Sequence, residues 1–193
     1  MRWNIRRVGI LLAIILFSIG FGFAFDAIVD KVERHRYPKP VAYTDFVAAD
    51  AAECGVPEAV IWAMVRQESN FVSSKAGESG EIGLMQLTPE QFADICERLL
   101  QTTGDSGLLY DPASNLRAGT ALLSDLYSRY GNWETVYAAW DTGTEQVDLW
   151  LADPTVSNGL GGLKKIPDRE TERFVKAVSK SVQKYTDLYD KGE

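Results

Sequence analysis

Apolar residues recur at helical spacing from Thr44 onward, and no alternating run of β-branched residues is long enough to predict a strand. Residues that favour helix ends divide this pattern into segments, so the predicted fold class is mainly α. The first four predicted helices run from a Thr44 cap to Gly55, from Pro57, from a Thr88 capping box with Gln91, and through a Leu116–Tyr130 stripe to Gly131. The last three run from Asn132 through Trp140, from a Thr144 cap to Leu151, and from Asp168 along a stripe of Phe174, Val178, Val182, Tyr185 and Leu188, after a loop at 152–165.

The N-terminal pattern is different, because Val8–Phe25 is apolar and uncharged and follows three arginines. A run of this length predicts a single transmembrane helix, with residues 1–25 as an anchor, rather than a buried core helix. A signal peptide cleaved after Ala24 stays open, since Gly22 and Ala24 are small. The arginines favour the cytoplasmic side, so we expect a single-pass protein of the cell membrane with the rest of the chain on the extracytoplasmic side.

Residues 26–42 carry mixed charges and end in Pro38 and Pro40, which predicts an extended stalk before a domain over 43–189. His35 lies in this stalk and is expected to be solvated. Cys54 and Cys96 would face an oxidising space, where both the paired and the free forms are open.

The amino-acid composition limits the kinds of active site and partner that the chain can have. The 193 residues include one His and two Cys, too few for a structural zinc site, and a Ser-His-Asp or Cys-His centre would need His35 as its base. Residues 1–40 hold seven basic and three acidic residues and residues 41–193 hold 13 and 24, giving net charges of +4 and −11. An acidic domain argues against nucleic-acid binding. We therefore expect carboxylate chemistry with no metal and no cofactor.

One carboxylate stands out. In the helix that begins at Pro57, Glu68 follows Ile61, Met64 and Val65 at spacings that place it on their apolar face. Desolvation and the negative end of the helix dipole both raise the pKa of a carboxyl group there, as a general acid requires. An exposed Glu at a frayed helix end is the alternative.

A second segment lies just before the Thr88 cap. Gly83 allows close backbone approach, Met85 offers a soft apolar contact and Gln86 a planar amide. These groups suit one face of a sugar, although ordinary packing of a loop onto a helix explains them equally well.

Four ordered motifs, Glu68–Phe71, Gly83–Gln86, Ala138–Asp141 and Ile166–Thr171, together resemble the soluble lytic transglycosylase domain, which is related to goose-type lysozyme. The resemblance extends from about Tyr43 to Tyr185. It implies a lysozyme-like helical fold that acts on the glycan strands of peptidoglycan. The implied reaction cleaves the β-1,4 bond between N-acetylmuramic acid and N-acetylglucosamine and leaves 1,6-anhydro ends, formed without water.

The resemblance also implies roles for residues. Glu68 would protonate the leaving oxygen and then accept the proton of the sugar's own C6 hydroxyl, so that no second carboxylate and no metal is needed. The residues expected to bind substrate are Ser69, Gly83, Met85, Gln86, Trp140, Asp141 and Phe174. The sequence names no protein partner.

Five positions depart from the family pattern. Gly77 stands where Ser is usual, Glu81 replaces Ala, Trp140-Asp141 replaces Tyr-Asn, and Phe174 lacks the usual Tyr hydroxyl. Trp140 is either a sugar-stacking or a core aromatic. Asp141 is either a local turn residue or a base that activates water, and the second role would make the protein a hydrolytic muramidase. The loss of this hydroxyl and of the family Asn and Ser favours a third alternative, a non-catalytic wall-binding or scaffold protein.

Overall fold

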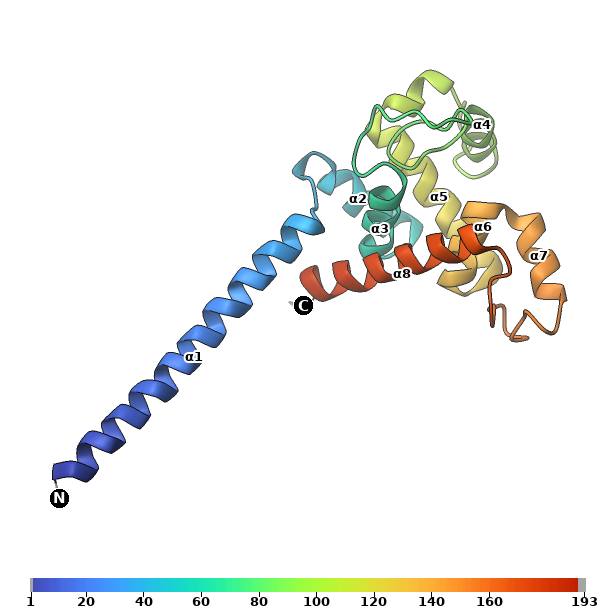
Figure 1. Cartoon of the computed structure of the whole chain (residues 1–193). Helices are drawn as coiled ribbons and strands as arrows, with labels where there is room; N and C mark the ends of the chain where they lie inside the picture. Colours follow the sequence, from blue (N-terminus) through green and yellow to red (C-terminus); the bar gives the residue numbers. More distant parts are fainter. Residues whose placement is uncertain (1, 191–193) are drawn as a thin grey trace. The chain divides into compact units, whose positions relative to one another are not determined.

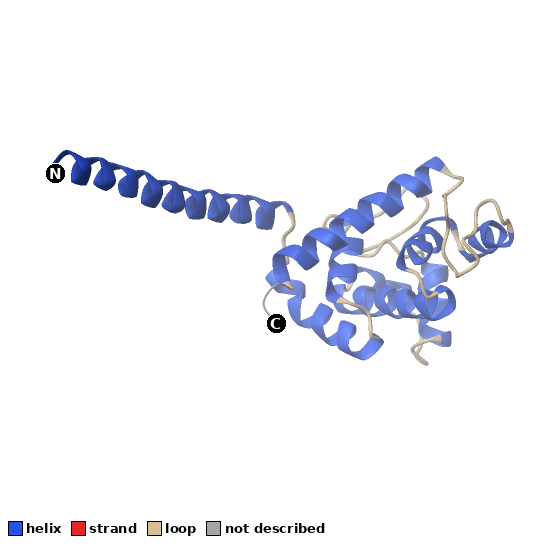
Figure 2. Ribbon diagram, turned by 90° about the horizontal axis from the view of Figure 1, so that it is seen from below, coloured by secondary structure: helices blue, strands red, loops and turns tan. Residues whose placement is uncertain are grey.

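The computed structural model describes the backbone of residues 2–190 and the side chains of residue 10, residues 15–22 and residues 24–190. The chain forms two compact units, Met1–Pro38 and Lys39–Glu193. Figures 1 and 2 show the helices of each unit and the loops that join them. The predicted mainly α class is confirmed, because the regular secondary-structure elements in the described part are all helices.

The first unit is one helix, α1 (Arg2–Arg36). Among the described residues, no helix combines the length and the apolar character needed to cross a membrane. The structure therefore does not support the transmembrane span predicted for residues 1–25. The side chains at 8, 9, 11–14 and 23, which belong to the predicted span, lie outside the described residues.

The segment after Phe25 is helical rather than extended as far as Arg36, where α1 ends, and residues 37–40 lie outside a helix before α2 begins at Val41. The charges in this segment lie at helical spacing. Arg34 pairs with Asp30 at 2.8 Å, one turn earlier. Pro38 and Pro40 follow the end of α1 and so do not interrupt it.

Within residues 39–190, the second unit contains seven α-helices and one 3-10 helix. Helix α5 packs against α2, α4 and α6, whereas α8 packs against α3 and α6 (Figure 1). Helix α3 lies at the centre, and every residue from Ala59 to Val65 is buried. The helices are α2 (Val41–Cys54), α3 (Glu58–Glu68), α4 (Pro89–Arg98), η1 (Ser106–Tyr110), α5 (Pro112–Tyr130), α6 (Trp133–Thr142), α7 (Thr144–Ala152) and α8 (Arg169–Tyr189).

Most predicted helix ends are confirmed. Thr88 and Gln91 form the capping box of α4. The side chains of Asn132 and Asp168 cap α6 and α8. Gly55 and Gly131 end α2 and α5 in the left-handed conformation that favours glycine.

Two predicted N-caps are wrong. Helix α2 starts three residues before Thr44, after Pro40, and the Thr44 hydroxyl donates to the Val41 carbonyl at 2.9 Å. Thr144 is the first residue of α7, and Gly143 occupies the N-cap position. The N-cap residues of these two helices are Pro40 and Gly143. Each has the non-helical backbone conformation of an N-cap, although neither has a side chain that accepts a hydrogen bond.

The chain between α3 and α4 is an ordered loop. Short antiparallel bridges join Ile82 to Ala76 and to Leu87, so the loop doubles back on itself. Cys96 on α4 is buried, Cys54 on α2 is partly exposed, and both are free thiols. The open question of a disulfide is therefore answered by two unpaired cysteines in this structure.

Candidate active site

Glu68 is the last residue of α3, and the chain turns sharply after it. Asn70 and Phe71 have φ angles of 49° and 68°, a region that non-glycine residues seldom occupy. The Ser69 hydroxyl donates to the Val65 carbonyl at 3.1 Å, inside the last turn. These features end the helix at Glu68 and fix the point from which its side chain extends.

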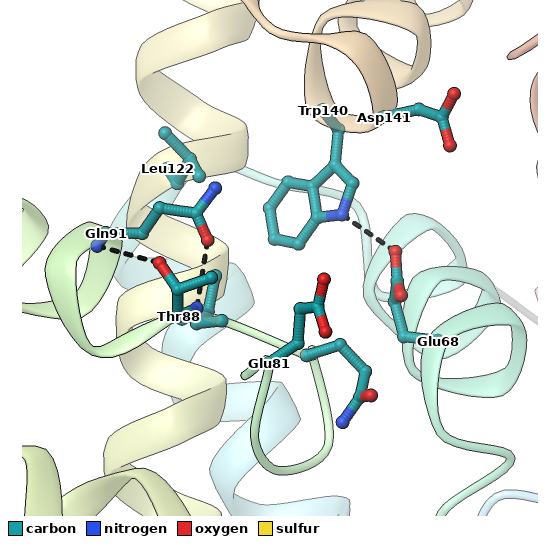
Figure 3. Close-up of a pocket in the computed structure, with 9 residues that line it drawn as sticks. Glu68, Glu81, Thr88, Gln91, Leu122, Trp140 and Asp141 are labelled. Carbon is teal, nitrogen blue, oxygen red and sulfur yellow. Dashed lines mark hydrogen bonds between the residues drawn. The ribbon is translucent and has the colours of Figure 1, made fainter. Parts of the chain in front are cut away.

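The Glu68 carboxyl group is largely enclosed and has a single side-chain donor described for it. Trp140 Nε1 donates to Glu68 Oε1 at 2.8 Å, across from α6 (Figure 3). An indole N–H can donate but not accept, so Oε1 accepts whether or not the acid is ionised. Because the carbonyl oxygen of a protonated carboxyl group is the better acceptor, this hydrogen bond favours the acidic proton on Oε2.

Electrostatics favour the protonated acid. Burial raises the pKa of Glu68 from its ordinary value of 4.5 to about 7, against the opposing effects of the Trp140 hydrogen bond and the Lys75 ammonium. The charges on Asp141 and Glu81 raise this pKa further. Lys75 also donates from Nζ to the Glu68 carbonyl oxygen, so its charge is held at the end of α3. The direction of the shift is the one expected from the sequence.

The carboxyl group faces a pocket of about 260 Å³. The walls come from the end of α3, the loop before α4, and α4, α5 and α6 (Figure 3). A second hollow of about 250 Å³ lies beside it, and Trp140 borders both. The lining residues of the first pocket are Glu68, Glu81, Gln86, Leu87, Thr88, Gln91, Leu122, Trp140 and Asp141.

The structure brings only some of the predicted substrate-binding residues together. Gln86, Trp140 and Asp141 line the pocket with Glu68. Ser69 is buried and Phe174, on α8, is half-buried, and neither is among the lining residues.

Gly83 and Met85 support the pocket from inside the protein. A Cβ on Gly83 would lie 2.2 Å from Asn115 Nδ2, and the φ angle of Gly83 is 86°. The close contact that requires glycine at position 83 is therefore with Asn115 of the protein itself. Met85 is fully buried, and a Cβ on Gly119 would lie 2.3 Å from its sulfur.

Asn115 holds this loop in place. Its Oδ1 accepts the Met85 N–H at 2.7 Å, and its Nδ2 donates to the carbonyls of Ile82 and Leu109, both at 2.9 Å. One buried amide thus satisfies three backbone groups. The sequence places Asn115 in an Asn-Leu pair after Asp111-Pro112, but spacing alone gives it no partner.

Several lining residues were not predicted. The sequence indicates only a capping box for Thr88 and Gln91, yet their side chains also face the pocket (Figure 3). Their position directly after the Gly83–Gln86 segment is the signal that was available. Glu81 was noted only as a departure from the family, and it also lines the pocket.

Among the described side chains, no group of three or more His, Cys, Asp or Glu residues lies close enough to hold a metal ion. The polar groups in the pocket are carboxyls, amides, one hydroxyl and one indole N–H. This arrangement can exchange protons with a substrate and hydrogen-bond to its hydroxyl and amide groups.

Residues 45–158, more than half of the chain, match the family described as the transglycosylase SLT domain. The chain belongs to this family. The lytic transglycosylase Slt of Pseudomonas aeruginosa, solved as an inactive mutant, superposes with a TM-score of 0.73 at 27% identity over 83% of this chain. The 70 kDa soluble lytic transglycosylase of Escherichia coli gives the same TM-score, identity and coverage. The predicted transglycosylase-like helical fold is thus confirmed.

Two curated relatives agree with this assignment. The soluble lytic murein transglycosylase of Escherichia coli (strain K12) is 30% identical over 144 residues, which is 72% of this chain and 22% of that protein. Membrane-bound lytic murein transglycosylase C of Yersinia pestis (strain Pestoides F) is 32% identical over 104 residues, 53% of this chain and 29% of that protein. The chain therefore spans less than a third of the length of either relative.

Proposed function

We propose that the domain is a peptidoglycan lytic transglycosylase with Glu68 as its acid and base. The observation that carries this proposal is the enclosed Glu68 carboxyl group, whose pKa burial raises to about 7, at the wall of an open pocket. Such a group is protonated in a large fraction of molecules at neutral pH and can donate to a leaving oxygen. Membership of the SLT family supports the same reaction.

The reaction needs two proton transfers at one carboxyl group. Glu68 first donates the proton on Oε2 to the glycosidic oxygen between N-acetylmuramic acid and N-acetylglucosamine. The Trp140 N–H bond to Oε1 stabilises the carboxylate that remains. The carboxylate then accepts the proton of the C6 hydroxyl as O6 bonds to C1, which closes the 1,6-anhydro ring. Glu68 is then protonated again for the next cycle.

The test is digestion of purified peptidoglycan by the full chain in detergent, with products identified by mass spectrometry. We expect anhydro-muramoyl ends, each lighter by one water than the hydrolytic product. Glu68→Gln is expected to lose this activity while still binding the glycan. Glu97→Gln makes the same chemical change on an exposed face of α4 outside the pocket and should retain it. Full activity of Glu68→Gln would refute the assignment. If the unmodified chain bound peptidoglycan but released no soluble products, this result would indicate a scaffold protein.

We also propose that α1 holds the protein at the cell membrane, with the catalytic domain on the extracytoplasmic side. Support comes from the apolar run Val8–Phe25 after three arginines. Large apolar side chains of α1, including Leu16, Phe17 and Phe21, are exposed. Burying such surface in lipid is favourable.

Fractionation of cells that produce the full chain tests this placement. We expect the protein in the membrane fraction after alkaline carbonate extraction, with an intact N-terminus by mass spectrometry. Leu16→Arg should weaken retention, since a charge near the bilayer centre costs about 3 kcal/mol. Recovery of a soluble form that begins at Phe25 would instead indicate a cleaved signal peptide.

A further inference from the structure

A second carboxylate enters the pocket from the loop between α3 and α4. Glu81 lines the same pocket as Glu68, and its carboxylate points into the space below the Trp140 ring (Figure 3). The two acids interact electrostatically, since the charge on Glu81 contributes to the raised pKa of Glu68.

The backbone around Glu81 holds this carboxylate in place. Glu81 Oε2 accepts the Ser79 N–H at 3.1 Å, and the Glu81 carbonyl accepts the Gly77 N–H at 2.7 Å. A Cβ on Gly77 would lie only 2.2 Å from Glu81 Oε2. The carboxylate thus occupies the space that a side chain at position 77 would fill, and its place in the pocket depends on glycine at that position.

Asp141, the other acid able to act as a base toward water, is placed less well. Its side chain is exposed, and its carboxylate points away from the Trp140 ring (Figure 3). Glu81 is therefore the carboxylate better placed to meet a water molecule inside the pocket.

We propose that Glu81 is a general base that directs part of the turnover to hydrolysis. This inference rests on the proposed function, because Glu68 still supplies the acid. Glu68 donates its proton to the glycosidic oxygen, and the bond from C1 to that oxygen breaks. A water oxygen bonds to C1 from the opposite face while one of its protons passes to Glu81 Oε1. Both acids then return to their starting protonation states by exchange with solvent.

This second carboxylate gives the reaction two outcomes. Internal attack by O6 yields an anhydro end, whereas attack by water yields a reducing end with inverted configuration at C1. Both routes share the first proton transfer from Glu68, so Glu81 sets the ratio of products rather than the ability to cleave.

The experiment is digestion of peptidoglycan in water enriched in oxygen-18 by the full chain and its variants. We expect the unmodified chain to give anhydro ends together with reducing ends that carry the heavy isotope, released as the α-anomer. Glu81→Gln should lower the labelled fraction on the order of 100-fold, as for loss of a general base, and keep the anhydro ends. Glu78→Gln removes an exposed acid of the same loop that does not line the pocket and should leave the ratio unchanged.

Gly77→Ser provides an independent test because it displaces the carboxylate without removing it. We expect it to lower the labelled fraction in the same direction as Glu81→Gln. Two results would overturn the role of Glu81 and leave the proposed function intact. One is that the unmodified chain gives only anhydro ends. The other is that Glu81→Gln and Gly77→Ser both leave the ratio of labelled reducing ends to anhydro ends unchanged. No product of either kind would refute the proposed function and this inference with it.

Discussion

The enclosed Glu68 carboxyl group makes a contribution to stability that becomes less favourable as pH rises. Glu68 has a pKa of about 7 in the folded chain, against 4.5 as its ordinary value. Below about pH 4.5 both states hold the proton, and Glu68 adds no pH dependence. Between the two values the unfolded chain loses the proton while the folded chain retains it, so the folded state becomes less stable. Above pH 7 the full penalty applies, about 3 kcal/mol at about 1.4 kcal/mol for each pKa unit.

Glu68→Gln removes this penalty, and the Gln carbonyl can still accept the Trp140 N–H. Urea unfolding of the full chain and the variant, followed by circular dichroism at pH 4 and pH 8, measures the effect. We expect similar free energies of unfolding at pH 4 and a variant more stable by about 3 kcal/mol at pH 8. The exposed control Glu97→Gln should show no comparable pH-dependent gain. A difference between Glu68→Gln and the parent that is equal at both pH values would refute the reasoning, because Glu68 would then titrate alike in both states.

Three further substitutions test the surroundings of Glu68. Trp140→Phe removes a hydrogen bond that lowers the pKa of Glu68, so the alkaline limb of the pH–rate profile should move to higher pH, and an unmoved limb would count against that contact. Asn115→Asp keeps the acceptor for the Met85 N–H but loses both donors, and should lower the free energy of urea unfolding by about 1–3 kcal/mol. Gly119→Ala places a Cβ 2.3 Å from the Met85 sulfur and should cost about 1–3 kcal/mol, part of which Met85→Ala should restore in a double-mutant cycle of thermal unfolding.

Local chemistry made much of the fold predictable. The Thr88 capping box and the caps at Asn132 and Asp168 depend on hydrogen bonds between residues two or three apart, which the sequence displays directly. The predicted caps at Thr44 and Thr144 are wrong because a helix can also start without a capping side chain. Where the backbone before the helix already has the non-helical conformation of an N-cap, the helix begins without a capping side chain.

The candidate site was predictable only in part. Helical spacing identified Glu68 because its apolar neighbours lie within two turns of the same helix. The hydrogen bond from Trp140 joins residues 72 positions apart, and its geometry depends on how α6 packs in the folded domain. Asn115 reaches back 30 residues to Met85, which no local pattern reveals. Such contacts form only when distant helices pack, so the sequence shows the donors and acceptors without their pairing.

Glycine at position 77 leaves the space that the Glu81 carboxylate occupies in the pocket. A Cβ at position 77 and the Glu81 carboxylate cannot occupy the same place, since they would lie 2.2 Å apart. In a chain with a side chain at 77, an acid at 81 would have to turn away from this place in the pocket. Once the acid is present, glycine cannot be replaced without displacing it. Related sequences with glutamate at this loop position should therefore carry glycine four residues earlier, a pairing that an alignment of close relatives would reveal.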